Sequence, residues 1–97
     1  MGWMKIRLTT EQIVAGEVDR VQNAFDQLFI AHHSPHAALL LGRGEADDDY
    51  ELFFSPQATE LAAPMLGTMG AQPCSPPPRD GTALVIGDRV AFEEVLR

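Results

Sequence analysis

The stretch that decides the fold is Ala37–Ser55, AALLLGRGEADDDYELFFS. Two apolar runs, 37–43 and 50–55, flank a short polar segment and are bounded by residues that favour turns. Apolar runs of this length predict β-strands. Because the polar segment is short enough for a hairpin, we expect two antiparallel strands in the middle of the chain.

The polar segment and its margin are rich in carboxylates, namely Glu45, Asp47, Asp48, Asp49 and Glu51. A calcium loop requires a glycine at its sixth position. Counting from Asp47 or Asp49 places Leu52 or Phe54 there. We therefore expect a solvated, self-repelling loop without a metal, and a docking patch for a basic partner is the alternative.

The first third of the chain predicts a strand followed by a helix. Met4–Thr9 alternates apolar and polar residues, which is typical of a half-buried strand. Thr9 and Gln12 then fit a capping box. A helical apolar stripe runs from Val14 to Phe29 and ends before Pro35. Gly16 weakens its first turns, so Glu17 is the alternative start.

The second half contains a further helix and a further strand. Ser55–Pro56 reads as an N-cap and first helical position, and Pro64 predicts a kink or a break near Ala63. The proline-rich segment 70–81 predicts an extended, polyproline-like connection. The apolar run 82–87, TALVIG, predicts a central strand. Residues 88–97 predict a short helix, with a hairpin as the alternative.

These elements place the chain in the α+β class as one domain, 1–97. Their order is β-α-β-β-α-β, which matches the split βαβ or ferredoxin-like plait. We therefore expect an antiparallel sheet with both helices on one face, followed by a short C-terminal helix. The analogy is architectural and indicates no family.

Charge and composition limit the classes of partner. The formal net charge is −7, which disfavours nucleic acid and anionic membrane surfaces. No apolar run approaches the roughly 18 residues of a membrane-spanning helix. The single cysteine, Cys74, cannot form an intramolecular disulfide. We therefore expect a cytoplasmic protein.

Candidate ligands and nucleophiles are few. His32, His33 and His36 follow the long helix, but Pro35 interrupts the spacing that would let His32 and His36 share a metal. Cys74 lies in a proline-rich segment, where no neighbouring base or helix N-terminus would activate it. The sequence contains no hydrolase, nucleotide-binding or zinc-protease motif. We expect neither a cofactor nor a catalytic site.

The leading hypothesis is a non-catalytic protein-binding or regulatory module. In a plait the helices leave one sheet face open, and here that face would carry Lys5, Arg7, Phe53 and Val85. A partly apolar open face suits a protein partner or a second copy in a homodimer. The alternative is a small-ligand-binding or enzymatic domain with a pocket near His32, His36 and Cys74.

Overall fold

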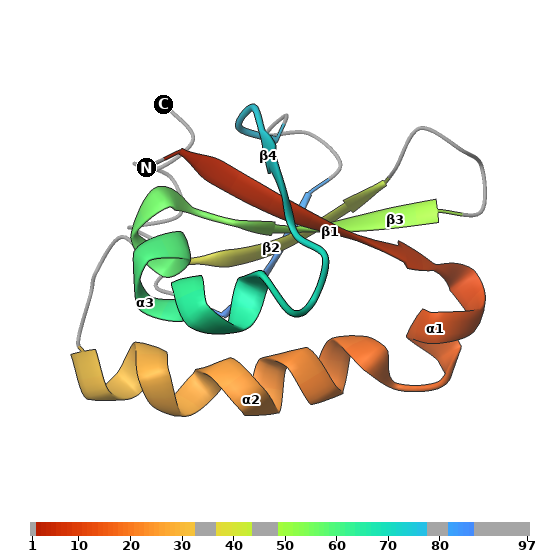
Figure 1. The fold of residues 1–97 in the computed structure, drawn as a ribbon. Coiled ribbons are helices and arrows are strands. Elements are labelled where there is room, and N and C mark those ends of the chain that lie inside the picture. The colour runs from red at the N-terminus through yellow and green to blue at the C-terminus, as the bar shows by residue number, and fades with distance from the viewer. Residues whose placement is uncertain (1, 33–36, 44–48, 78–81, 87–97) are drawn as a thin grey trace.

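The computed structural model describes residues 2–32, 37–43, 49–77 and 82–86. Within these ranges the chain is an α+β fold with five strands and three helices (Figure 1). In chain order the elements are β1 (Trp3–Thr9), α1 (Thr10–Val14), α2 (Glu17–His32), β2 (Leu39–Arg43), β3 (Asp49–Phe54), α3 (Pro56–Leu66), β4 (Gln72–Cys74) and β5 (Ala83–Ile86).

The strands form one sheet in the order β4-β1-β3-β2-β5, and every neighbouring pair is antiparallel. The predicted pairing of the two middle strands is confirmed, with Leu40 opposite Phe53. The order differs from that of a simple plait because a fifth strand, β5, pairs with β2. The antiparallel α+β class was therefore predictable from the sequence, whereas the arrangement of its edges was not.

The two edge strands correct two predictions. Ala83–Ile86 forms β5 at the edge beside β2, so the expectation of a central strand there is wrong. Gln72–Cys74, expected to be part of an unpaired connection, forms β4 and pairs with β1. A proline is compatible with an edge strand because its missing N–H removes only one ladder bond. Pro73 therefore does not prevent this pairing.

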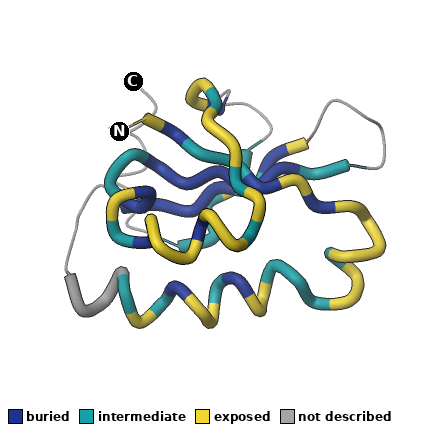
Figure 2. The backbone as a smooth tube through the Cα atoms, viewed as in Figure 1, coloured by how far each residue is buried: buried dark blue, intermediate teal, exposed yellow. Residues whose placement is uncertain are grey.

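One face of the sheet packs against both long helices. Figure 1 shows α2 and α3 on the same side of the strands, and Figure 2 shows the buried residues concentrated along the central strands and one side of α2. Phe25 of α2 and Phe54 of β3 are fully buried, with ring centroids 5.5 Å apart and planes at 78°. This edge-to-face contact joins the helix layer to the sheet in the main core.

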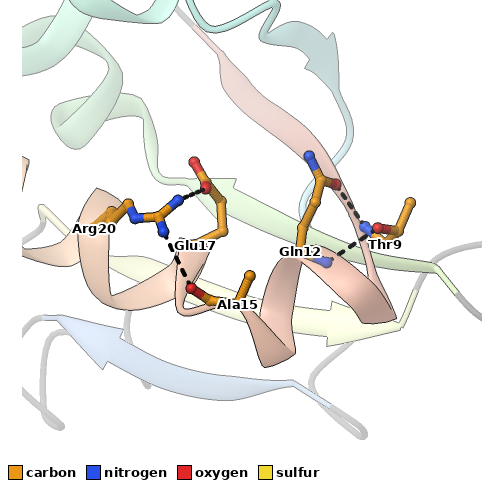
Figure 3. A network of polar contacts seen from close by, with 5 residues as sticks. All are labelled: Thr9, Gln12, Ala15, Glu17 and Arg20. Atoms are coloured by element: carbon orange, nitrogen blue, oxygen red, sulfur yellow. Dashed lines mark hydrogen bonds and ion pairs between the residues drawn. The ribbon is translucent and has the colours of Figure 1, made fainter.

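The first helical segment is divided at Gly16. The predicted capping box is confirmed, because Gln12 N donates to Thr9 Oγ1 and Thr9 N donates to Gln12 Oε1, at 3.2 and 2.8 Å (Figure 3). Gly16 has a φ of +88°, which ends α1 and lets α2 begin at Glu17. Arg20 spans the junction by donating to the Glu17 carboxylate and the Ala15 carbonyl.

The third helix is a single element, so of the two alternatives predicted near Ala63 the break is wrong, and the kink stays a prediction. Pro64 lies in the last turn and is exposed to solvent. At this position the proline removes one late hydrogen bond, and water can solvate the displaced carbonyl. At the other end, Ser55 Oγ accepts from Ala58 N at 3.3 Å, which confirms the predicted N-cap.

Several predicted features lie outside the described residues. These are most of the acidic loop, the histidines at 33 and 36, and the helix expected over 88–97. Across the described part of the chain, no helix combines the length and the apolar character that a membrane span requires.

Candidate functional site: the second face of the sheet

The sheet has a second face, opposite α2 and α3, and it carries most of the candidate residues. Along β1, Ile6 and Leu8 point into the main core, so strand alternation sends Lys5 and Arg7 to the other side. We call this the second face; it is made of Trp3, Lys5, Arg7, Leu40, Asp49, Glu51 and Phe53. The predicted placement of Lys5, Arg7 and Phe53 on one face is confirmed.

The apolar half of the second face is buried. Trp3, Leu40 and Phe53 form a second cluster, with Cys74 and Leu84 packed against it. Phe53 is only 7% exposed, so the expectation that it lies open to solvent is wrong. Alternation along a strand determines the face on which a side chain lies, but it does not determine what covers that face. Phe53 therefore belongs to a satellite core.

Val85 lies on the side of the main core, which corrects its predicted place beside Phe53. Leu39 pairs with Ile86, whereas the next residue, Leu40, pairs with Leu84. Val85 is therefore an extra residue between these two pairs. An extra residue of this kind interrupts the alternation of a strand, so sequence parity no longer identifies the face.

Two ion pairs cross from β1 to β3 on the charged half of the second face, defined as Lys5, Arg7, Asp49 and Glu51. Lys5 Nζ lies 2.6 Å from Glu51 Oε2, and Arg7 Nε lies 3.5 Å from Asp49 Oδ2. Arg7 stands directly opposite Glu51 in the β1–β3 register. Both pairs are therefore diagonal contacts between neighbouring strands, which long side chains can reach.

Glu51 is an unusual member of this group because it is buried. Its exposed fraction is 5%, which contradicts the expectation that the acids of this region are all solvated. Within the described part of the chain, its Oε2 accepts no hydrogen bond of good geometry. The 2.6 Å approach of Lys5 Nζ is therefore the contact that balances the charge of this oxygen. A buried carboxylate without such a cation would be strongly destabilising.

The cation is the more exposed partner in both pairs. The side chain of Lys5 is 29% exposed against 7% for Glu51. The side chain of Arg7 is 61% exposed against 18% for Asp49. The four formal charges of this half cancel, and in each pair the cation is the member that solvent reaches more.

A cavity adjoins these cations where β1 meets β4. Its volume is about 160 Å³, and the described residues that line it are Lys5, Arg7, Gly70 and Gln72. Gln72 is directly opposite Lys5 in the β1–β4 register. Gly70 has a φ of +71°, which lets the chain turn from α3 into β4. The lining is polar and carries two cations and one amide.

Cys74 also lies near the second face, opposite Trp3 in the β1–β4 register. Burial raises the pKa of its thiol above the ordinary value. The Lys5 ammonium lowers that pKa and the Glu51 carboxylate raises it, each by less than burial does. A raised pKa reduces the thiolate fraction at neutral pH, so the environment opposes nucleophilic reactivity.

The sequence also predicted a grouping of Cys74 with His32 and His36. The side chain of His32 and the whole of His36 lie outside what the structure describes. Among the described residues, no group of three or more histidine, cysteine, aspartate or glutamate side chains could hold a metal ion.

Sequence reasoning did not place the charged partners Asp49 and Glu51 or the cavity residues Gly70 and Gln72 at this site. Alternation in β3 would have placed Asp49 and Glu51 on the same face as Phe53, so that signal was present. Gly70 and Gln72 carried no comparable signal, because the pairing of β4 with β1 is a long-range contact. Comparison of the chain with protein-family models, with curated proteins and with solved structures found no match.

Proposed function

We propose that this protein is a non-catalytic binding module that docks another protein on the charged half of its second face. The observation that carries the proposal is that Lys5 and Arg7 are more exposed than their carboxylates and that both line one cavity. Fixed charges at a surface steer a partner of opposite charge and determine its orientation. The partner we infer therefore presents acidic side chains.

The buried apolar half of the second face supports this choice of surface. Trp3, Leu40 and Phe53 are each at most 7% exposed, so they offer little area to a partner. Arg7 offers much more, and arginine is enriched at protein interfaces because its guanidinium binds carboxylates with two donors. Docking through Arg7 is thus better supported than docking through Phe53.

The state of Cys74 supports a non-catalytic role. Nucleophilic catalysis by cysteine depends on a thiolate favoured by a lowered pKa. Burial raises the pKa of the Cys74 thiol instead. The single cysteine is also compatible with a reducing compartment, and we infer a cytoplasmic location from it.

A charge-reversal experiment tests the docking proposal. Tagged wild-type protein, Arg7→Glu and Arg20→Glu are used to capture partners from a lysate of the native cell, and native mass spectrometry gives the stoichiometry. Arg20 is the matched control because it is also exposed but lies at the α1–α2 junction. We expect one stoichiometric complex that survives Arg20→Glu and is lost in Arg7→Glu. A complex that both variants retain would contradict the proposal.

A second copy of the chain is the competing occupant. The chain carries a net charge of −7, which repels a second copy at long range as it repels any acidic partner, so either contact depends on local complementarity at Lys5 and Arg7. The same native mass measurement distinguishes the two cases. If the wild type is a homodimer and Arg7→Glu is a monomer, the occupant of the charged half is a second copy of the chain and not a different protein.

A small-ligand-binding domain is the second candidate function, and the polar cavity beside Lys5 favours it. Ligand pockets commonly combine a cavity with a few convergent polar groups. The sequence predicted a ligand pocket at a different place, near His32, His36 and Cys74, and that pocket stays a prediction. Tight binding of a metabolite without any Arg7-dependent protein complex would favour this second function.

We also propose that the fold is a ferredoxin-like plait extended by one strand. The chain order through β4 is βαββαβ once α1 is counted with α2, and both long helices contact the same core. The additional strand, β5, extends the sheet at β2. A solved structure of the protein with β5 on any other strand would contradict this relation.

A further inference from the structure

The cavity beside Lys5 has the size and the lining of a site for one small charged group. At about 160 Å³ it is large enough to admit a small charged group. Its described walls are the side chains of Lys5, Arg7 and Gln72 and the backbone turn at Gly70. A Cβ added at Gly70 would meet nothing within 4 Å, so this wall leaves the space beside it open.

The charges around the cavity are arranged in two layers. Lys5 and Arg7 line it, whereas Glu51 and Asp49 pair with them and are the more buried partners. A group that enters the cavity therefore meets the cations first. The ion pairs also restrict the cations before binding, which lowers the entropy cost of ordering them around a ligand.

The donors that remain at the cavity suit a planar anion. Arg7 contacts Asp49 through Nε at 3.5 Å, and its side chain is 61% exposed, so the guanidinium stays accessible to a ligand. The fork geometry of arginine matches a carboxylate with two parallel hydrogen bonds. Gln72, opposite Lys5 in the sheet, adds an amide that can donate further hydrogen bonds.

We propose that this cavity binds the carboxylate of an acidic side chain on the protein partner. The inference rests on the proposed docking function and specifies the group that the partner contributes. Arg7 supplies the bidentate contact, Lys5 adds a second positive charge, and Gln72 orients the carboxylate at the wall formed by β4. Glu51 and Asp49 act as positioning residues for the two cations.

The test uses a pair of blocked tripeptides that differ in one group. Gly-Glu-Gly carries a single carboxylate, and Gly-Gln-Gly is nearly the same shape without the charge; inorganic phosphate is the third probe. Each is titrated into ¹⁵N-labelled full-length protein at constant ionic strength, and amide shifts of residues 5, 7, 70 and 72 are followed. We expect saturable shifts with Gly-Glu-Gly and none with Gly-Gln-Gly.

Variants connect the binding to the named side chains. Arg7→Gln should weaken Gly-Glu-Gly at least about tenfold, because a charge-assisted bidentate contact is lost. Arg20→Gln changes the net charge equally at the α1–α2 junction, where Arg20 pairs with Glu17 and does not line the cavity, and should leave the affinity unchanged. Lys5 is tested as Lys5→Gln/Glu51→Gln, since removing Lys5 alone would leave the buried Glu51 without its cation. This double variant should also weaken binding.

Three results would overturn the inference. The first is equal chemical-shift changes with the two tripeptides, and the second is equal affinity of wild type and Arg7→Gln for Gly-Glu-Gly. The third is saturation by phosphate without saturation by Gly-Glu-Gly, which would identify a site for a free inorganic anion. The docking proposal fails separately. If the Arg7-dependent complex forms but Gly-Glu-Gly does not bind, the carboxylate site is wrong and the docking surface stands. If Gly-Glu-Gly binds but no Arg7-dependent complex forms, the docking surface is wrong and the carboxylate-binding cavity stands.

Discussion

At the scale of single residues, the fold depends on aromatic side chains on both faces of the sheet. Phe25 and Phe54 occupy the main core, and Phe53 occupies the second cluster with Trp3. Neighbouring residues Phe53 and Phe54 thus support two separate cores. Substitutions at these positions test whether each core is needed for folding.

Phe25→Ala should lower the free energy of unfolding by about 3–5 kcal/mol, because it leaves a cavity where a fully buried ring met Phe54. Urea denaturation of the wild type and the variant measures the difference. Val14→Ala is the control, since Val14 is 83% exposed and should change stability by less than about 0.5 kcal/mol. Similar losses in the two variants would show that Phe25 is not in the core.

Phe53→Glu should remove the cooperative thermal transition, because it buries a second carboxylate beside Trp3 and Leu40. Lys5, which stands opposite position 53, is already paired with the buried Glu51. Phe53→Leu keeps the site apolar and should cost roughly 1–2 kcal/mol. Far-UV circular dichroism during thermal unfolding compares the two. A Phe53→Glu variant that melts cooperatively near the wild-type temperature would restore the sequence-based expectation of an exposed Phe53.

Cys74 should react with iodoacetamide more slowly in the folded protein than in urea at the same pH. Burial raises the pKa of the folded thiol, so the thiolate fraction is smaller than in the unfolded chain. Because the pKa of the thiol is higher in the folded state, its contribution to the free energy of unfolding is fully present at pH values below the unfolded-state pKa. That contribution is lost as the pH rises through the folded-state pKa. A faster reaction in the folded protein would contradict a raised pKa.

At the scale of elements, the N-cap residues of α1 and α3 differ in their exposure to solvent. Thr9 caps α1 on the surface, whereas Ser55, which is fully buried, caps α3. Ser55 Oγ also accepts from Ala38 N at 2.9 Å, and Ser55 N donates to the Ala38 carbonyl at 3.0 Å. The cap of α3 therefore also fixes the chain just before β2.

Ser55→Ala should destabilise the protein by about 2–4 kcal/mol, the sum of a lost cap and a buried Ala38 N–H without its acceptor. Thr9→Ala removes only an exposed cap and should cost about 0.5–1 kcal/mol. Chemical denaturation of both variants gives the comparison. If the two substitutions cost the same, the contact between Ser55 and Ala38 contributes nothing to stability.

At the scale of the whole molecule, one sheet separates two apolar clusters. The main core joins α2 and α3 to the sheet, and the second cluster lies on the other face. Leu52, Phe53 and Phe54 are consecutive in β3 and alternate between the two. Because the clusters share their strands, we expect them to unfold together.

The single tryptophan makes this expectation measurable. Trp3 belongs to the second cluster, so its fluorescence reports that face, whereas far-UV circular dichroism reports mainly the helices. The two signals should give the same urea midpoint, as a two-state transition requires. A lower urea midpoint by fluorescence than by circular dichroism would mean that the second cluster opens while the main core stays folded.

The sequence alone was sufficient for the elements whose signals are local. Thr9 with Gln12 and Ser55 with Pro56 marked helix starts because capping involves residues only a few positions apart. Alternation placed Lys5, Arg7 and Phe53 on one face because successive side chains in a strand point in opposite directions. The alternative helix start at Glu17 and the pairing of β2 with β3 were likewise predictable from neighbouring residues.

Tertiary structure alone decided the sheet edges, the covering of each face and the composition of the cavity. The pairing of β4 with β1 places Gln72 opposite Lys5, although most of the chain separates the two residues in sequence. No local pattern encodes that contact. The extra residue Val85 in β5 and the burial of Phe53 also depend on neighbours distant in sequence. The physical reason is that burial and strand pairing are properties of contacts between segments, whereas propensity and periodicity are properties of one segment.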